Sequence, residues 1–164
     1  MAALTAAALI VFIIEAQVPL PIPVPGAKLG LANAITLFAF FYKGPKERGA
    51  GALTTANVFM ILICRIILGA VFTGRFVAFL FSLSGGLLGF AAQAITKRFV
   101  TDRQIWACGA VGAVSHNVGQ ILAAMLVTGT PAIAAYLPIL VIAGVATGVI
   151  TGLAAQLTLS RIAR

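Results

Sequence analysis

The chain has almost no acidic side chains, and this shortage constrains its fold more than any other feature. Only three of its 164 residues are carboxylates, Glu15, Glu47 and Asp102, against eleven Lys and Arg. Hydrophobic residues make up 62% of the sequence and charged residues 9%. A water-soluble domain needs a surface much richer in charge, so the composition predicts an integral membrane protein. Three separate carboxylates also exclude a two-metal site or a catalytic carboxylate pair.

Six apolar segments are predicted to be helices, over residues 2–18, 29–42, 50–68, 71–95, 104–127 and 132–159. A membrane-crossing helix needs about 20 apolar residues. The second segment is too short to cross alone, so we expect its outer end to stop below the surface. The first segment could be a signal peptide, but it lacks a basic start and a small-residue cleavage site, which favours a helix. Residues 18–26 have Pro at every second position, which predicts an extended loop.

The basic residues are unevenly distributed between these segments. Alternate gaps and the C-terminal tail hold eight of them: Lys43, Lys46, Arg48, Lys97, Arg98, Arg103, Arg161 and Arg164. The opposite gaps hold only Lys28 and Arg75, and Arg65 lies near the predicted outer end of the third segment. Cytoplasmic loops of membrane proteins carry the excess of Lys and Arg. The sequence therefore predicts a single all-α transmembrane domain over residues 1–164, with six membrane-spanning helices and both termini in the cytoplasm.

Small residues at a spacing of four predict where these helices pack. The sixth segment carries Gly144, Gly148 and Gly152, and the fourth carries Gly85 and Gly89. Small residues four apart let two helices approach closely in lipid, so we expect these glycines to pack inside the bundle. The first segment carries the pairs Ala2/Ala6 and Ala3/Ala7. These alanines could equally well contact a partner protein near the cytoplasmic end.

Polar side chains within the apolar segments predict a binding site. They are expected in the outer half of the membrane or at its midplane, with none in the inner half. Polar and charged groups in a spanning segment are costly and face a protein interior or water, and several at one depth indicate a pocket open to the outside. The candidate ligand-binding residues are Glu15, Lys28, Asn33, Arg65, Arg75, His116, Asn117 and Gln120.

Each candidate also has a structural interpretation. Glu15 could form an ion pair with Arg65 or Lys28. The side chain of Arg75 could extend to the membrane surface. Asn117 and Gln120 could link helices, and a lone histidine such as His116 is more often a hydrogen-bonding residue than a metal ligand.

Several common kinds of chemistry leave no trace in the sequence. Cys64 and Cys108 lie in apolar segments without a CxxC motif, and there is no GxxxxGK[ST] nucleotide-binding motif. No cofactor, metal or nucleic acid is therefore expected.

Four stretches carry a resemblance to a known family: PLPIPVPGAKLGLANAITL (19–37), SLSGGLLG (82–89), SHNVGQ (115–120) and YLP (136–138). In this order they resemble the bacterial membrane family heptaprenyl diphosphate synthase component I, also called the Gx transporter family. That family is similar to the substrate-binding S components of energy-coupling-factor (ECF) transporters. The resemblance implies a six-helix fold in the bacterial cell membrane and a first loop that acts as a lid. It also implies that Ala2, Ala3, Ala6 and Ala7 contact a transmembrane coupling protein driven by cytoplasmic ATPases.

The expected function is therefore a membrane-embedded, substrate-binding subunit for uptake, and not an enzyme. Lys28, Arg65 and Arg75 outnumber Glu15 at the outer mouth, which favours an anionic group on the ligand. The apolar surroundings favour a hydrophobic part, as in an isoprenoid phosphate or a vitamin-like molecule. An accessory membrane subunit of a heptaprenyl diphosphate synthase is the alternative, and a purely structural subunit of a larger membrane complex is a third possibility.

Overall fold

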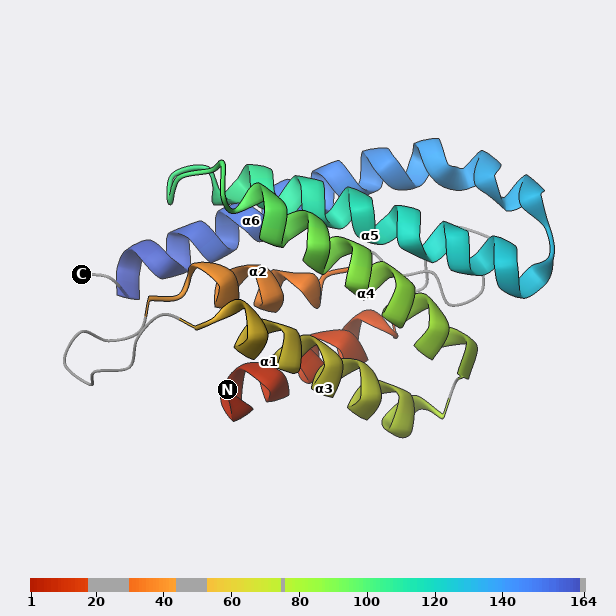
Figure 1. Ribbon diagram of the computed structural model, residues 1–164, viewed down its shortest axis with the longest axis horizontal. Coiled ribbons are helices and arrows are strands. Elements are labelled where there is room, and N and C mark those ends of the chain that lie inside the picture. The colour runs from red at the N-terminus through yellow and green to blue at the C-terminus, as the bar shows by residue number, and fades with distance from the viewer. Residues whose placement is uncertain (18–29, 44–52, 75, 163–164) are drawn as a thin grey trace.

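The protein is all-helical in the computed structural model, which describes residues 1–17, 30–43, 53–74 and 76–162. Its helices lie in one bundle and follow the long axis of the molecule (Figure 1). In chain order they are α1 (Ala2–Glu15), α2 (Asn33–Phe41), α3 (Thr55–Thr73), α4 (Phe76–Thr96), α5 (Ile105–Thr128), the 3-10 helix η2 (Pro131–Tyr136) and α6 (Leu137–Ile162). Several sequence predictions fall on residues outside the described ranges: the Pro-rich loop, Lys28, Lys46, Arg48, Arg75 and Arg164.

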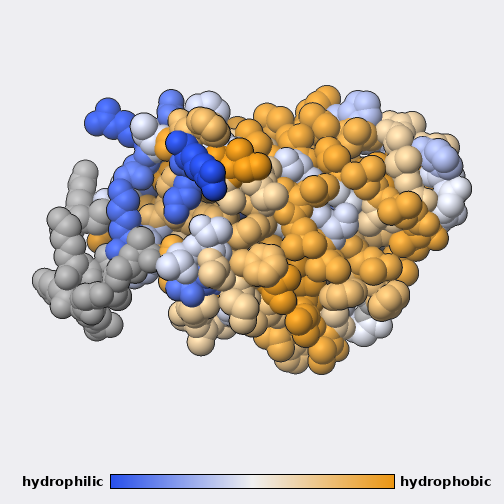
Figure 2. Space-filling model, in the orientation of Figure 1, coloured by the Kyte–Doolittle hydropathy of each residue, from blue (hydrophilic) through white to orange (hydrophobic). Residues whose placement is uncertain are grey.

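Four helices in the described ranges are long and apolar enough to cross a membrane. They are Thr55–Thr73, Phe76–Thr96, Ile105–Thr128 and the continuous η2–α6 stretch Pro131–Ile162. Charged side chains gather at one end of the molecule, while apolar side chains cover most of the remaining visible surface (Figure 2). We call this the charged end and define it by Lys43, Lys97, Arg98, Asp102, Arg103 and Arg161. This distribution is that of a multi-pass membrane protein.

The chain reverses between the two ends of the bundle in the predicted order. The start of α1, the end of α6 and the α4–α5 connection lie toward the charged end, while the α3–α4 turn and η2 lie at the opposite end (Figure 1). Six α-helices are present among the described residues, but only four have the length of a membrane span. The cytoplasmic location of the charged end stays a prediction.

Helices α1 and α2 are shorter than predicted and stop partway along the bundle (Figure 1). With 14 and 9 residues, they measure about 21 Å and 14 Å, against about 30 Å for the apolar core of a bilayer. Gly30, just before α2, lies against the ring of His116, and His116 is midway along α5. Phe41, at the far end of α2, lines a cavity together with Ile105, the first residue of α5. Helix α2 therefore covers only half the depth of the long helices.

The α3–α4 boundary also differs from the prediction. Helix α3 begins at Thr55, because the Thr54 side chain accepts a hydrogen bond from the Asn57 backbone (3.2 Å) and caps its first turn. It continues past Gly69, where it was predicted to stop, and ends at Gly74, which has a left-handed conformation (φ 61°). Gly69 instead accommodates Phe12, because a Cβ there would lie 2.6 Å from the ring. This glycine is a packing position of a continuous helix.

Glycines hold α4, α5 and α6 in close contact, as the sequence predicted. A Cβ added at Gly148 would lie 2.5 Å from the Gly109 carbonyl oxygen of α5, and one at Gly152 would lie 2.5 Å from the Cα of Trp106. On the other side of α5, a Cβ at Gly89 would lie 3.1 Å from the carbonyl oxygen of Gly112. Only glycine allows the backbones to approach to these distances. The three helices therefore form the central layer of the bundle. Helices α2 and α3 lie against this layer, and α1 lies against α2 and α3.

Candidate functional site

The candidate residues that the structure describes lie deep within the bundle. Each is at most 5% exposed. They come from α1, α2, α3 and α5, and they lie at or close to the level where α1 ends and α2 begins. The six residues are Glu15, Asn33, Arg65, His116, Asn117 and Gln120.

Glu15, the last residue of α1, binds the backbone at the start of α2. Its Oε1 atom accepts hydrogen bonds from the N–H groups of Gly30 and Leu31 (3.2 Å for Leu31). Gly30 has a left-handed conformation (φ 79°), which a glycine adopts without strain. A carboxylate just before a helix also interacts favourably with the positive end of the helix dipole. Glu15 therefore ties the end of α1 to the start of α2.

Arg65 lies deeper in the membrane than the sequence analysis placed it. Because α3 continues to Thr73, Arg65 is about 12 Å from the end of its helix. Its Nη2 atom donates a hydrogen bond to Oδ1 of Asn33 (3.4 Å), and its guanidinium lies over the Phe12 ring, 5.9 Å from the centroid. The oppositely charged Glu15 lies nearby, because it binds the N–H of Leu31, two residues before the Asn33 that Arg65 contacts. No nitrogen–oxygen contact within 4.0 Å joins the two, since the one such salt bridge among the described residues is Lys43–Asp102.

His116 is surrounded by the glycines of α4 and by the start of α2. A Cβ at Gly85 would lie 2.8 Å from His116 Cε1, and one at Gly30 would lie 2.9 Å from Cδ2. A hydrogen bond joins Nε2 of His116 to Nε2 of Gln120 (2.9 Å), and their i, i+4 spacing puts both residues on one face of α5. A Cβ at Gly89 would lie 3.3 Å from His116 Cβ and 3.4 Å from Nδ2 of Asn33. The α4 glycines thus bring His116 and Asn33 into one cluster.

Asn117 contacts a different helix from the other candidates. Its Nδ2 atom donates a hydrogen bond to the Leu140 carbonyl of α6 (2.6 Å), and Gly144 leaves the space for this contact. Asn117 therefore links α5 to α6, in agreement with its structural interpretation. We call the remaining residues, Glu15, Asn33, Arg65, His116 and Gln120, the mid-depth polar cluster.

Two atoms of the mid-depth polar cluster have no partner in the described part of the chain. They are Nδ2 of Asn33 and Nε of Arg65, and both are buried. A buried donor without a partner costs about 1–3 kcal/mol, so such donors indicate a place for water or a polar ligand. The described cluster contains one carboxylate and one guanidinium. The excess of positive charge expected at the site therefore rests on Lys28 and Arg75, outside the described residues.

The inner half of the apolar segments was expected to hold no polar side chains, and this expectation is wrong. Gln93 of α4 is 2% exposed and lies one turn from the end of its helix at the charged end. Its Oε1 atom and Oγ1 of Thr36 on α2 are buried and have no partner among the described residues. The sequence could have indicated this buried polar position, because Gln93 interrupts an otherwise apolar stretch. Its packing on Gly112, where a Cβ would lie 2.5 Å from Gln93 Nε2, could not be read from the sequence.

The cavities described in the structure lie away from the mid-depth polar cluster. One, of about 160 Å³, is at the charged end, and one, of about 500 Å³, is an apolar surface groove between the ends of α3 and α4. No residue of the cluster lines either of these two cavities. In the described ranges, no group of three or more His, Cys, Asp or Glu side chains could hold a metal ion.

The alanines of α1 are partly available to a partner. Ala2, Ala3 and Ala6 are exposed, while Ala7 is half-buried and Ala8 is buried. The outward face of α1 continues with Ile10 and Ile14, which are 57% and 58% exposed. Of the two predicted pairs, Ala2/Ala6 is the one that the bundle leaves free.

Comparison with known proteins gives one match. The model of the family described as heptaprenyl diphosphate synthase component I matches residues 4–158. No curated protein and no solved structure matches the chain.

Proposed function

The chain belongs to the family of heptaprenyl diphosphate synthase component I, and we propose that it is a membrane-embedded, substrate-binding subunit of an uptake transporter. In this proposal it binds a small amphipathic or anionic ligand from the side opposite the charged end. Movement of the ligand is driven by partner ATPases through a coupling membrane protein of the ECF type.

The observation that carries this proposal is the mid-depth polar cluster at the meeting point of α1 and α2. Its side chains are almost fully buried, yet Asn33 Nδ2 and Arg65 Nε lack partners among the described residues. A bundle stabilised only by packing gains nothing from a buried guanidinium with an unpaired donor. A polar ligand would satisfy such donors, and intramembrane ionisable groups are typical of substrate pathways.

The lengths of α1 and α2 support a ligand site on the side of the mid-depth polar cluster that faces away from the charged end. The four long helices continue beyond the level at which α1 ends and α2 begins, whereas α2 lies entirely between that level and the charged end. A ligand that reaches Asn33 and Arg65 from the far side would therefore meet the ends of two helices. The first N–H groups of a helix have no partner within that helix and favour anions, which fits a ligand with an anionic or carbonyl group.

The exposed alanine face of α1 supports the coupling partner. Ala2 and Ala6 lie four residues apart on its outward side, and small residues at this spacing allow close helix–helix contact in lipid. Replacing Ala6 with Trp should abolish uptake and leave ligand binding intact. The matched control is Leu126→Trp, because Leu126 is 85% exposed on α5. Full uptake by the Ala6 variant would show that the coupling contact is elsewhere.

An accessory subunit of a heptaprenyl diphosphate synthase is the second candidate, and the description of the matching family favours it. The two functions predict different partners. Purification under mild conditions followed by native mass spectrometry should retain a coupling protein with ATPases for a transporter subunit, and a soluble prenyl synthase for an accessory subunit.

The decisive experiment uses the same preparation to measure ligand binding. Any small molecule retained by the purified protein is identified by mass spectrometry, and its affinity is measured for the unmodified chain and for Arg65→Met and Asn33→Ala. Each substitution should weaken binding by about 1–3 kcal/mol. Asn117→Ala is the control, because Asn117 contacts α6 and should affect stability alone. Normal binding by both cluster variants would refute the proposed site.

A further inference from the structure

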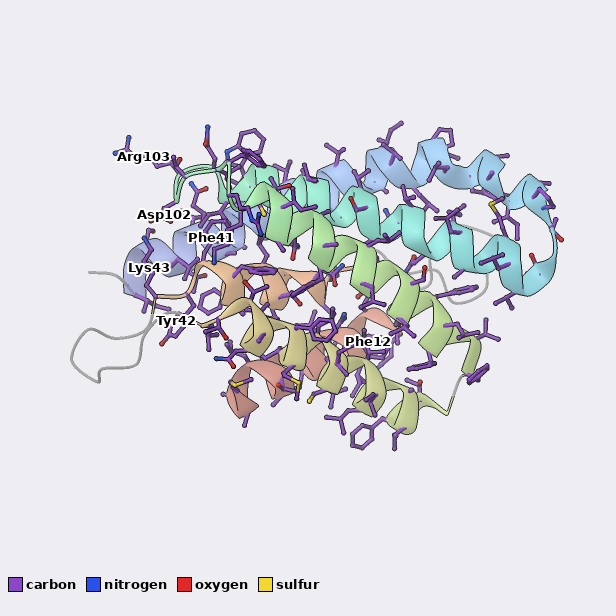
Figure 3. All side chains as sticks on the ribbon, in the orientation of Figure 1. Phe12, Phe41, Tyr42, Lys43, Asp102 and Arg103 are labelled. Carbon is purple, nitrogen blue, oxygen red and sulfur yellow. The ribbon has the colours of Figure 1, made fainter. Side chains whose placement is uncertain are left out.

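One of the two cavities lies at the charged end, away from the mid-depth polar cluster. It has a volume of about 160 Å³ and lies where α2 ends, α5 begins and α6 ends. Figure 3 shows that the labelled side chains of Phe41, Tyr42, Lys43 and Asp102 gather there. Because a water molecule takes about 30 Å³ of liquid volume, the cavity has room for a small polar headgroup. We propose that it binds the phosphate headgroup of an anionic membrane lipid.

The chemistry of the walls is that of an amphipathic site. Apolar side chains form one part of the lining: Phe41, Ile105, Leu159 and Ile162. Polar side chains form the other part: Lys43, Asp102, Gln156 and Ser160. Oε1 of Gln156 is buried and has no partner among the described residues, so it can accept a hydrogen bond from a glycerol hydroxyl. The lining therefore offers an apolar surface to a chain and polar atoms to a headgroup.

The charge around the cavity favours an anion. The described part of the charged end has five basic side chains and a single carboxylate, that of Asp102. Lys97 adds positive charge beneath the lining, because its Nζ lies 5.5 Å from the centroid of Phe40 and 5.9 Å from that of Phe41. Basic clusters at the membrane surface attract anionic lipids at about 1 kcal/mol per Lys or Arg. A phosphate is thus the favoured headgroup.

The position of the cavity favours a lipid over a dissolved phosphate. Trp106, in the first turn of α5, is 41% exposed, and Phe99, in the α4–α5 connection, is 81% exposed. Exposed Trp residues are typical of the level of lipid headgroups. The cavity is formed at the same connection, by Asp102 and Ile105, so its mouth lies at the depth of the headgroups. A lipid there would place its chain against the apolar walls.

Asp102 is the residue that the headgroup must displace. Its Oδ2 atom forms a salt bridge with Nζ of Lys43, and the two side chains are 64% and 72% exposed. An exposed pair of this kind contributes about 0–1 kcal/mol, so exchanging the carboxylate for a phosphate costs little. The proposal therefore predicts opposite effects for the two members of one salt bridge.

The test measures binding of a short-chain phosphatidylglycerol to the purified protein in detergent at physiological salt. Lys43→Met should weaken binding at least about tenfold, the value of a charged hydrogen bond. Asp102→Asn should strengthen it by about fivefold, since it removes one negative charge. Arg98→Gln is the matched control: Arg98 is exposed at the same end and does not line the cavity. Its loss removes only the general attraction of one basic side chain and should weaken binding by about fivefold at most, less than the loss of Lys43.

Each other outcome overturns the proposal. Equal losses in the Lys43 and Arg98 variants would mean general attraction to a basic surface. Weaker binding in the Asp102 variant would mean a site for a cation or a neutral ligand. Equal binding of phosphatidylcholine with the same chains would mean that the headgroup charge is not recognised, and equal binding of inorganic phosphate would mean that no lipid is required. Circular dichroism of each variant verifies that it is folded.

Discussion

Replacing Glu15 with Gln tests the mid-depth polar cluster most directly, because the change keeps the shape of the side chain and removes its charge. Glu15 is 5% exposed, accepts hydrogen bonds from the Gly30 and Leu31 backbone and carries the charge opposite to that of Arg65. The Gln oxygen can still accept both bonds. The loss at each is therefore the difference between a charged and a neutral hydrogen bond, about 1 kcal/mol.

The effect on Arg65 is larger. The two charged groups make no contact within 4.0 Å. Two unit charges 4 Å apart attract each other by about 4 kcal/mol at an effective dielectric constant of about 20, so we take about 3 kcal/mol for this more widely separated pair. Glu15→Gln should therefore lower the free energy of unfolding by about 5 kcal/mol, the upper end of the range for breaking a buried charge pair. The double variant with Arg65→Met should cost about 3 kcal/mol less than the two single costs together.

The assay is reversible unfolding in mixed micelles with increasing sodium dodecyl sulfate, followed by circular dichroism. Asp102→Asn is the control, because it makes the same chemical change in an exposed salt bridge and should cost less than about 1 kcal/mol. If Glu15→Gln costs no more than this control, or if the double variant is additive, Glu15 and Arg65 do not form an energetically coupled pair.

Three further predictions concern packing, orientation and activity. Gly148→Leu should destabilise the bundle by about 3 kcal/mol or more, because no space exists between α6 and Gly109. The control Ala146→Leu, on the exposed face of α6, should change stability by no more than about 0.5 kcal/mol. Similar effects of the two substitutions would refute the glycine contact. In a background without Cys64 and Cys108, Gly129→Cys should react with an impermeant reagent outside the cell, and Arg103→Cys should react only after permeabilisation; the reverse would invert the topology. The purified protein, given allylic and isopentenyl diphosphates with magnesium, should make no longer product, and metal-dependent elongation would overturn the assignment as a binding subunit.

Much of the fold could be predicted because lipid leaves few choices. Apolar segments must form helices, and small residues four apart favour close contact between helices, so the spacing predicted that Gly148 and Gly89 pack inside the bundle, although not which helix each contacts. The end of α3 could not be predicted in this way. Gly69 and Gly74 are both glycines in an apolar stretch, and Gly69 is a packing position only because Phe12, far away in the sequence, lies over it.

The sequence predicted which residues belong to the candidate site better than it predicted how they are arranged. His116 and Gln120 could be paired from their spacing on one helix. Asn117 is adjacent to His116 in the sequence, yet it faces α6, and nothing local to the sequence indicates which neighbour each side of α5 meets. Gln93 was missed because the expectation of an entirely apolar inner half left no role for it. These assignments depend on how helices are arranged around α5, which hydropathy alone does not encode.

The shortness of α1 and α2 has a consequence for how the protein is made. A helix of 14 residues and one of 9 residues are too short to insert into a bilayer as independent spans. The end of α1 and the start of α2 would each leave backbone groups within the membrane that lipid cannot solvate. Those ends pack against Arg65, His116 and the α4 glycines, which are synthesised later. We therefore expect α1 and α2 to remain incompletely assembled until α5 has entered the membrane, although both are synthesised before α5.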